Sequence, residues 1–146
     1  AQTLKGLKKL RKLTANKCEF WDKSMAALSE APEIRSVVLF GSAVSDAGYA
    51  HIGKIEKLEE LRTSYRISDA GLAHLGGLKN LKSLNLWNSF VSMKAVRALP
   101  NLKNLKELEV STHLIKEDEA KKLAEELSGC KVWSGSVART ARSTSQ

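Results

Sequence analysis

Residues 81–99 read LKSLNLWNSFVSMKAVRAL, and this stretch decides the fold. Its apolar side chains stand at Leu81, Leu84, Leu86, Val91, Val96 and Leu99. Leu84 and Leu86 alternate with polar neighbours at the two-residue period of a β-strand, whereas Val96 and Leu99 have the spacing of one helix face. The stretch therefore predicts a short strand, a turn and a helix.

The same apolar pattern recurs along the chain. Units open at Leu10, Ile34, Leu58, Leu81 and Leu105, in steps of 24, 24, 23 and 24 residues. Neither element of one unit can bury its apolar face alone, whereas stacked units share a continuous core. Because a helix separates successive strands, the strands must be parallel, with right-handed crossovers. The sequence thus predicts an α/β solenoid of about five units with a parallel sheet on its concave face.

The strand motif resembles that of leucine-rich repeat proteins. Residues 81–86 carry the pattern L-x-x-L-x-L outright, and residues 67–75 (ISDAGLAHL) and 127–132 (LSGCKV) resemble the bacterial, planctomycete-type subclass. The resemblance covers residues 4–133 and implies a curved solenoid that binds other macromolecules, usually proteins. The chain departs from the pattern at Met93, which stands where other units have aspartate, and in mostly lacking asparagine after the strand.

The two ends of the solenoid differ from its middle. Leu4 and Leu7 fit the helix of a partial N-terminal unit over residues 1–9, which favours a fragment of a longer protein. At the other end, Gly129 is expected to end the last helix, and residues 129–133 to cap the solenoid with an edge strand. Residues 134–146, SGSVARTARSTSQ, are expected to form a basic Ser/Thr-rich tail that is disordered alone.

The charge is strongly basic and unevenly distributed. The 146 residues carry a net charge of +8, which favours acidic partners. The N-terminal basic cluster comprises Lys5, Lys8, Lys9, Arg11, Lys12 and Lys17. Nucleic acid is disfavoured because this cluster lacks interleaved aromatic residues and the concave face carries Glu60, Glu107 and Glu109. No apolar run is long enough to insert into a membrane.

No pattern typical of catalysis appears. The sequence lacks a glycine-rich phosphate loop, a C-x-x-C pair and an H-E-x-x-H motif. His51 and His74 occupy matching helix positions, but no further ligand completes a metal site, so we interpret them as exposed helix residues. Ser45, Ser68, Asp46 and Asp69 are interpreted as helix caps and first-turn acids. We predict no enzyme, cofactor, metal or small-molecule substrate.

The two cysteines give a weak indication of compartment. Cys18 and Cys130 lie in the first and last units, roughly 19 Å apart at about 4.8 Å per strand. That separation exceeds disulfide reach, so we predict two free thiols, which favour the cytoplasm. The family resemblance includes many exported proteins, so localisation stays open.

The concave face carries aromatic residues that the core does not require. Outward positions of adjacent strands place Phe40, Arg62, Asn85 and Trp87 together, with Tyr65 in the next turn. The remaining members of this candidate partner-binding surface are Val38, Lys12 and Asn16. Aromatic residues with arginine are typical of protein interfaces.

Three other interpretations remain at this point. The aromatic rings could pack against each other or against turn residues, or they could stack on a glycan. The chain could also be an accessory subunit of a larger assembly, docked through its basic N-terminal end and C-terminal tail.

Overall fold

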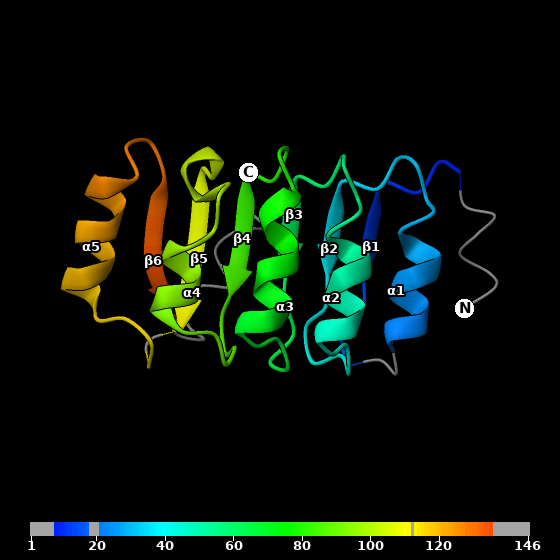
Figure 1. Ribbon diagram of the computed structural model, residues 1–146, viewed down its shortest axis with the longest axis horizontal. Helices are drawn as coiled ribbons and strands as arrows, with labels where there is room; N and C mark the ends of the chain where they lie inside the picture. Colours follow the sequence, from blue (N-terminus) through cyan, green and yellow to red (C-terminus); the bar gives the residue numbers. More distant parts are fainter. Residues whose placement is uncertain (1–7, 18–20, 112, 136–146) are drawn as a thin grey trace, which may run out of the picture.

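The computed structural model describes residues 8–17, 21–111 and 113–135 as an alternation of parallel strands and helices (Figure 1). The strands are β1 (Lys12–Thr14), β2 (Ser36–Val38), β3 (Glu60–Arg62), β4 (Ser83–Leu86), β5 (Glu107–Ser111) and β6 (Lys131–Gly135). The helices are α1 (Asp22–Leu28), α2 (Asp46–Ile52), α3 (Asp69–Ala73), α4 (Met93–Arg97) and α5 (Glu117–Glu126), with 3-10 turns η2 (His74–Gly77) and η3 (Leu102–Asn104). Lys5, Cys18 and the tail from residue 136 lie outside the described residues.

The strands form one parallel sheet in the order of the sequence, β1 to β6. The first residues of β1 to β5 pair in succession, from Lys12 through Ser36, Glu60 and Ser83 to Glu107. These pairings reproduce the 24-residue steps and the single 23-residue step. The predicted solenoid architecture is confirmed.

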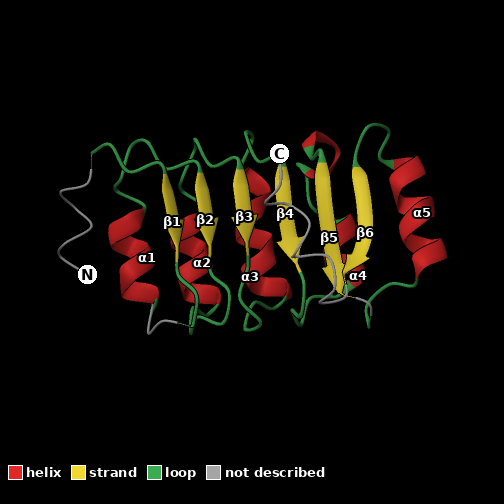
Figure 2. Cartoon of the chain, turned by 180° about the vertical axis from the view of Figure 1, so that it is seen from behind, coloured by secondary structure: helices red, strands yellow, loops and turns green. Residues whose placement is uncertain are grey.

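The helices cover one face of the sheet and leave the other open (Figures 1 and 2). Val37, Leu61, Leu84 and Leu108, one from each of four adjacent strands, are at most 1% exposed and point into the core. Residues two positions apart on a strand share a face, so their neighbours point to the open side. We call that side the open sheet face; it is the face expected to be concave.

The C-terminal boundary differs from the expectation. β6 continues to Gly135 because Ser134 pairs with Val110, and Gly135 pairs with Ser111, in register with β5. The first two residues of the expected tail therefore belong to the sheet, and the edge strand is longer than residues 129–133 allow. Gly129 has a positive φ of 89°, as expected where the last helix ends.

Tyr49 is fully buried, and its hydroxyl reaches the turn of the third unit, which is one residue shorter than the others. Its hydroxyl accepts a hydrogen bond from the backbone N–H of Ser64 at 2.8 Å and lies 3.3 Å from the Ser64 hydroxyl. Ser64 Oγ also donates to the carbonyl of Val44 at 3.2 Å. One tyrosine thus satisfies a buried amide in the turn where one residue is missing.

A ladder of aspartate and serine side chains links successive units. Asp46 accepts from both the backbone N–H of Ser68, at 2.9 Å, and its hydroxyl. Asp22 binds Ser45, and Asp69 binds Ser92, in the same two-point manner. The acids at these helix starts therefore have a structural role between units, beyond the first-turn role predicted for them. We call these three pairs the Asp–Ser ladder.

Asn101 is a buried polar residue at the opposite edge of the solenoid, where helices lead into strands. Its Nδ2 donates to the carbonyls of Leu75 and Leu78, at 3.1 and 2.9 Å. These bonds tie the fourth unit to the third. Asn80 makes a similar link one unit earlier, from its Nδ2 to the carbonyl of Glu56 at 2.8 Å, but from an exposed side chain.

Cys130 is a buried free thiol, as predicted. Burial raises the pKa of this thiol, so it behaves as a core residue. His74 is exposed and His51 half-buried.

Candidate functional site

The open sheet face brings most of the predicted binding residues together. Val38, Arg62 and Asn85 are paired across β2, β3 and β4, so they form one row. Phe40 and Trp87 come two residues after Val38 and Asn85, just beyond the ends of β2 and β4 and on the same side. Lys12 and Asn16 are exposed on the first unit, beside β2.

The two aromatic rings of this surface stack on each other. The centroids of Phe40 and Trp87 are 5.6 Å apart, with 13° between the ring planes. Their strands are separated by β3, a spacing of about 10 Å, so both side chains lean over the intervening unit. Packing of the rings against each other is therefore confirmed. Phe40 nonetheless remains 45% exposed, so the pair still presents apolar surface to solvent.

Not every residue in the row of Phe40 and Trp87 points to the open side of the sheet. Ser64 and Ser111 occupy the same position in their units, yet they are 1% and 2% exposed. Ser111 Oγ donates to the carbonyl of Leu86 at 3.2 Å, and Ser64 donates to Val44. Strand position alone therefore does not make a residue of this row point outward, because a small hydroxyl side chain can turn inward to satisfy backbone carbonyls.

Tyr65 and Arg62 border the stacked rings on β3 and the turn that follows it. Tyr65 is 44% exposed. The Arg62 guanidinium forms an ion pair with Glu60, with 3.5 Å between Nε and Oε1. Since Glu60 also accepts a hydrogen bond from Ser36, this part of the face is locally neutral and held in place.

A second cluster lies beyond Asn85, on β5 and β6. Glu109 accepts a hydrogen bond from Asn85 Nδ2 and another from the Trp133 side chain. Burial raises the pKa of Glu109, while Arg62 and Trp133 act in the opposite direction. A Cβ atom on Gly135 would lie 2.1 Å from Glu109 Oε1 and 2.9 Å from Trp87 Cδ1, so this glycine makes room for both side chains.

Sequence reasoning missed the role of Glu109, Trp133 and Gly135 in this surface. Trp133 is paired with Glu109 in the sheet, so it continues the row of Arg62 and Asn85 by two strands. Extending that row into the predicted edge strand would have found it. The packing of Gly135 beneath two side chains leaves no comparable signal in the sequence.

The basic end is exposed and lacks compensating acids within residues 8–17. Lys8, Lys9, Arg11, Lys12 and Lys17 are all exposed. None of the ion pairs among the described residues involves them, whereas Arg35, Lys57 and Lys82 are paired with glutamates. The predicted member Lys5 lies outside the described residues.

Comparison with solved structures identifies the architecture. No protein-family model and no curated protein matches the sequence. The structure is similar to the crystal structure of internalin C2 from Listeria monocytogenes, with a TM-score of 0.54 and 18% identity over 75% of this chain. Internalin C2 is a leucine-rich repeat protein.

This chain has the leucine-rich repeat fold.

The likeness is one of fold, and this leucine-rich repeat chain spans 46% of the internalin C2 structure. The resemblance to the planctomycete-type subclass stays a prediction.

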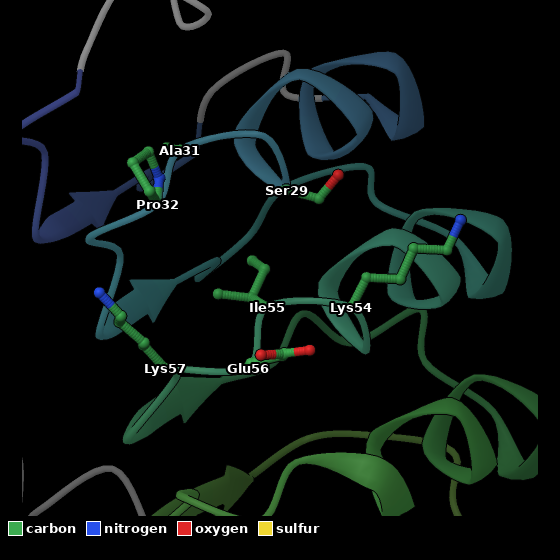
Figure 3. A pocket seen from close by; sticks show the side chains of 7 residues that line it. All are labelled: Ser29, Ala31, Pro32, Lys54, Ile55, Glu56 and Lys57. Carbon is green, nitrogen blue, oxygen red and sulfur yellow. The ribbon is translucent and has the colours of Figure 1, made fainter.

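A shallow hollow lies away from the open face of the leucine-rich repeat solenoid, where α1 and α2 end (Figure 3). It is lined by Ser29, Ala31, Pro32, Lys54, Ile55, Glu56 and Lys57. The lining contains no histidine or cysteine, and Lys57 is engaged by Glu33 at 2.6 Å. We therefore assign no chemistry to this hollow.

The described part of the chain lacks the features of two other kinds of site. It contains no group of three or more histidine, cysteine, aspartate or glutamate residues that could hold a metal ion. None of its helices is long and apolar enough to cross a membrane.

Proposed function

We propose that this chain is a non-enzymatic recognition module that binds a protein partner on its open sheet face. The observation that carries the proposal is the stacked pair Phe40–Trp87, whose rings lie outside the core. Although it stacks on Trp87, Phe40 remains 45% exposed. Tryptophan, tyrosine and arginine are enriched among the hot spots of protein interfaces, and aromatic rings bury a large area with little loss of conformational freedom.

The neighbours of this pair support a pre-formed surface. Arg62 is oriented by Glu60, and Asn85 is oriented by Glu109 and donates through Nδ2. The Asn85 Oδ1 atom in turn accepts from the backbone N–H of Trp87 at 2.9 Å. Side chains held in place before binding lose less entropy when a partner docks.

Removing the stacked pair tests the proposal. The variant Phe40→Ala/Trp87→Ala and the unmodified chain are immobilised and exposed to the same extract of the source cells. We expect proteins captured by the unmodified chain to fall at least tenfold on the variant, measured by quantitative mass spectrometry. The dissociation constant of the identified partner, measured by calorimetry, should rise by a similar factor.

A matched control uses aromatic residues that lie away from the open face. Trp21 and Phe90 are 55% and 76% exposed and lie in the turns that lead into α1 and α4. Trp21→Ala/Phe90→Ala should leave capture unchanged. Equal capture by the Phe40→Ala/Trp87→Ala variant would contradict the proposal, provided that its unfolding transition shows a folded chain.

A second candidate is an accessory subunit docked through its ends, which the exposed, unpaired cations of the first unit favour. Deletion of residues 136–146, which spares β6, should then release the chain from a large complex on size exclusion. If the shortened chain still eluted with the complex, the tail would not be needed for docking. Glycan stacking on Phe40 and Trp87 is distinguished by testing whether glycosidase treatment of the extract abolishes capture.

A further inference from the structure

We propose, on the basis of the recognition function above, that the bound partner segment lies across the strands of the open sheet face in one fixed orientation. Its carboxylates lie over β1, and a large apolar side chain packs on the Phe40–Trp87 pair. The partner is thus a protein segment that combines an acidic cluster with an apolar anchor.

The first support is the unpaired charge of the first unit. Lys12 on β1 and Lys17 beyond it are exposed, and no ion pair among the described residues uses them. Arg11, just before β1, instead acts on the Glu33 carboxylate. Most of the acids near the middle of the sheet are already engaged, since Glu59 binds both Arg35 and Lys82. Clustered unpaired cations attract an acidic segment and speed its encounter.

The second support is that the basic and aromatic parts are contiguous. Thr14 pairs with Val38, and the backbone N–H of Lys17 donates to the carbonyl of Phe40 at 2.8 Å. A Cβ atom on Gly41, next to Phe40, would lie 3.2 Å from Lys17 Cγ. The stem of this lysine therefore packs beside the strand that carries the ring, and one ligand can contact both.

The third support is the opposite charge at the far end of the sheet. β5 carries the exposed Glu107 and the half-buried Glu109, and the neighbouring β6 carries the exposed Lys131. An acidic cluster over β5 would face these carboxylates, whereas over β1 it faces cations only. The difference in charge between the two ends of the sheet therefore determines which end of the segment lies over β1.

The strand spacing sets the distance between the two features of the ligand. The two rings meet over β3, which is two strand spacings from β1, or about 10 Å at about 4.8 Å per strand. An extended chain covers about 3.4 Å per residue. The acidic cluster should therefore lie about three residues from the apolar anchor.

A library of random 12-residue peptides displayed on phage tests this inference with the full chain as bait. We expect enriched peptides to carry two or more Asp or Glu residues about three positions from a Trp, Phe or Leu. The enriched peptides are then synthesised with a fluorescent label, and their dissociation constants are measured by anisotropy at about 150 mM salt.

Two charge variants of equal net charge separate local attraction from general attraction. Lys12→Glu/Lys17→Glu alters the first unit beside Phe40, and Lys94→Glu/Lys122→Glu alters exposed lysines on α4 and α5. We expect the first to raise the dissociation constant roughly tenfold and the second less than twofold. Phe40→Ala should weaken the same peptides by at least fivefold.

The outcomes distinguish this inference from the proposed function. Enriched peptides that need Phe40 but neither acidic residues nor Lys12 and Lys17 would overturn the inference and leave the recognition function standing. Acidic peptides indifferent to Phe40→Ala and Trp87→Ala would overturn both. Equal weakening by the two charge variants, or a library without binders, would overturn the inference alone.

Discussion

Replacing Tyr49 with phenylalanine is expected to lower the free energy of unfolding by about 2 kcal/mol. The substitution preserves the buried ring but leaves the backbone N–H of Ser64, now bound at 2.8 Å, without its acceptor. A buried donor without a partner costs about 1–3 kcal/mol, because water cannot replace the lost bond. Urea unfolding followed by circular dichroism measures the change.

The exposed tyrosine provides a matched control. Tyr65 is 44% exposed, so Tyr65→Phe should change the free energy of unfolding by less than about 0.5 kcal/mol. Equal effects of the two substitutions would show that the Tyr49 hydroxyl contributes nothing specific.

Alkaline pH provides a second measurement on Tyr49. Burial raises the pKa of Tyr49 to about 12, from an ordinary value near 10. Above pH 10 the unfolded chain ionises this tyrosine while the folded chain keeps the proton, so stability falls between pH 10 and pH 12. We expect the fall to exceed that of Tyr49→Phe by about 2–3 kcal/mol. Parallel pH profiles for the two proteins would refute this assignment.

Replacing Asp46 with alanine is expected to cost about 2 kcal/mol of unfolding free energy. The carboxylate accepts from the N–H and the hydroxyl of Ser68 and so joins α2 to the start of α3. Hydrogen bonds to a charged group contribute about 1.5–3 kcal/mol. Because water can partly reach the freed N–H and hydroxyl of Ser68, we expect the loss of unfolding free energy to stay within that range. The midpoint of urea unfolding should fall accordingly, with an unchanged slope.

Asp118 is the matched control for Asp46, because it also lies in the first turn of a helix but is exposed in α5. Asp118→Ala removes only the interaction of the carboxylate with the helix dipole, about 0.3–1 kcal/mol. In a double-mutant cycle, Ser68→Ala should cost less once Asp46 is alanine, because only the cap bond from the Ala70 N–H to Ser68 Oγ is then lost. Additive costs would mean that the two side chains do not act as a pair.

Periodicity was sufficient to predict the fold because the core uses the same positions in every unit. Ile34, Leu58, Leu81 and Leu105 open their units and are at most 2% exposed, as the pattern requires. The Asp–Ser ladder could not be predicted, because a first-turn aspartate has the same sequence signature whether it caps its own helix or binds the next unit. Only the stacking geometry decides between these partners.

The candidate binding surface could be predicted only in part. Strand register placed Phe40, Arg62, Asn85 and Trp87 on one face, and that depends on alternation alone. Whether a residue at the strand end points outward depends on side-chain size and on nearby backbone carbonyls. This is why Ser64 and Ser111 turn inward while the two rings do not.

The stacking of Phe40 on Trp87 makes the surface depend on the number of units between them. Repeat proteins gain and lose whole units by duplication and deletion, and units added before β2 or after β6 would leave the two rings in contact. A unit inserted between β2 and β4 would widen the gap to about 14 Å and separate them. Lineages of this protein that retain the aromatic pair should therefore vary in length at their ends, with the 23-residue unit between the rings kept as a single copy.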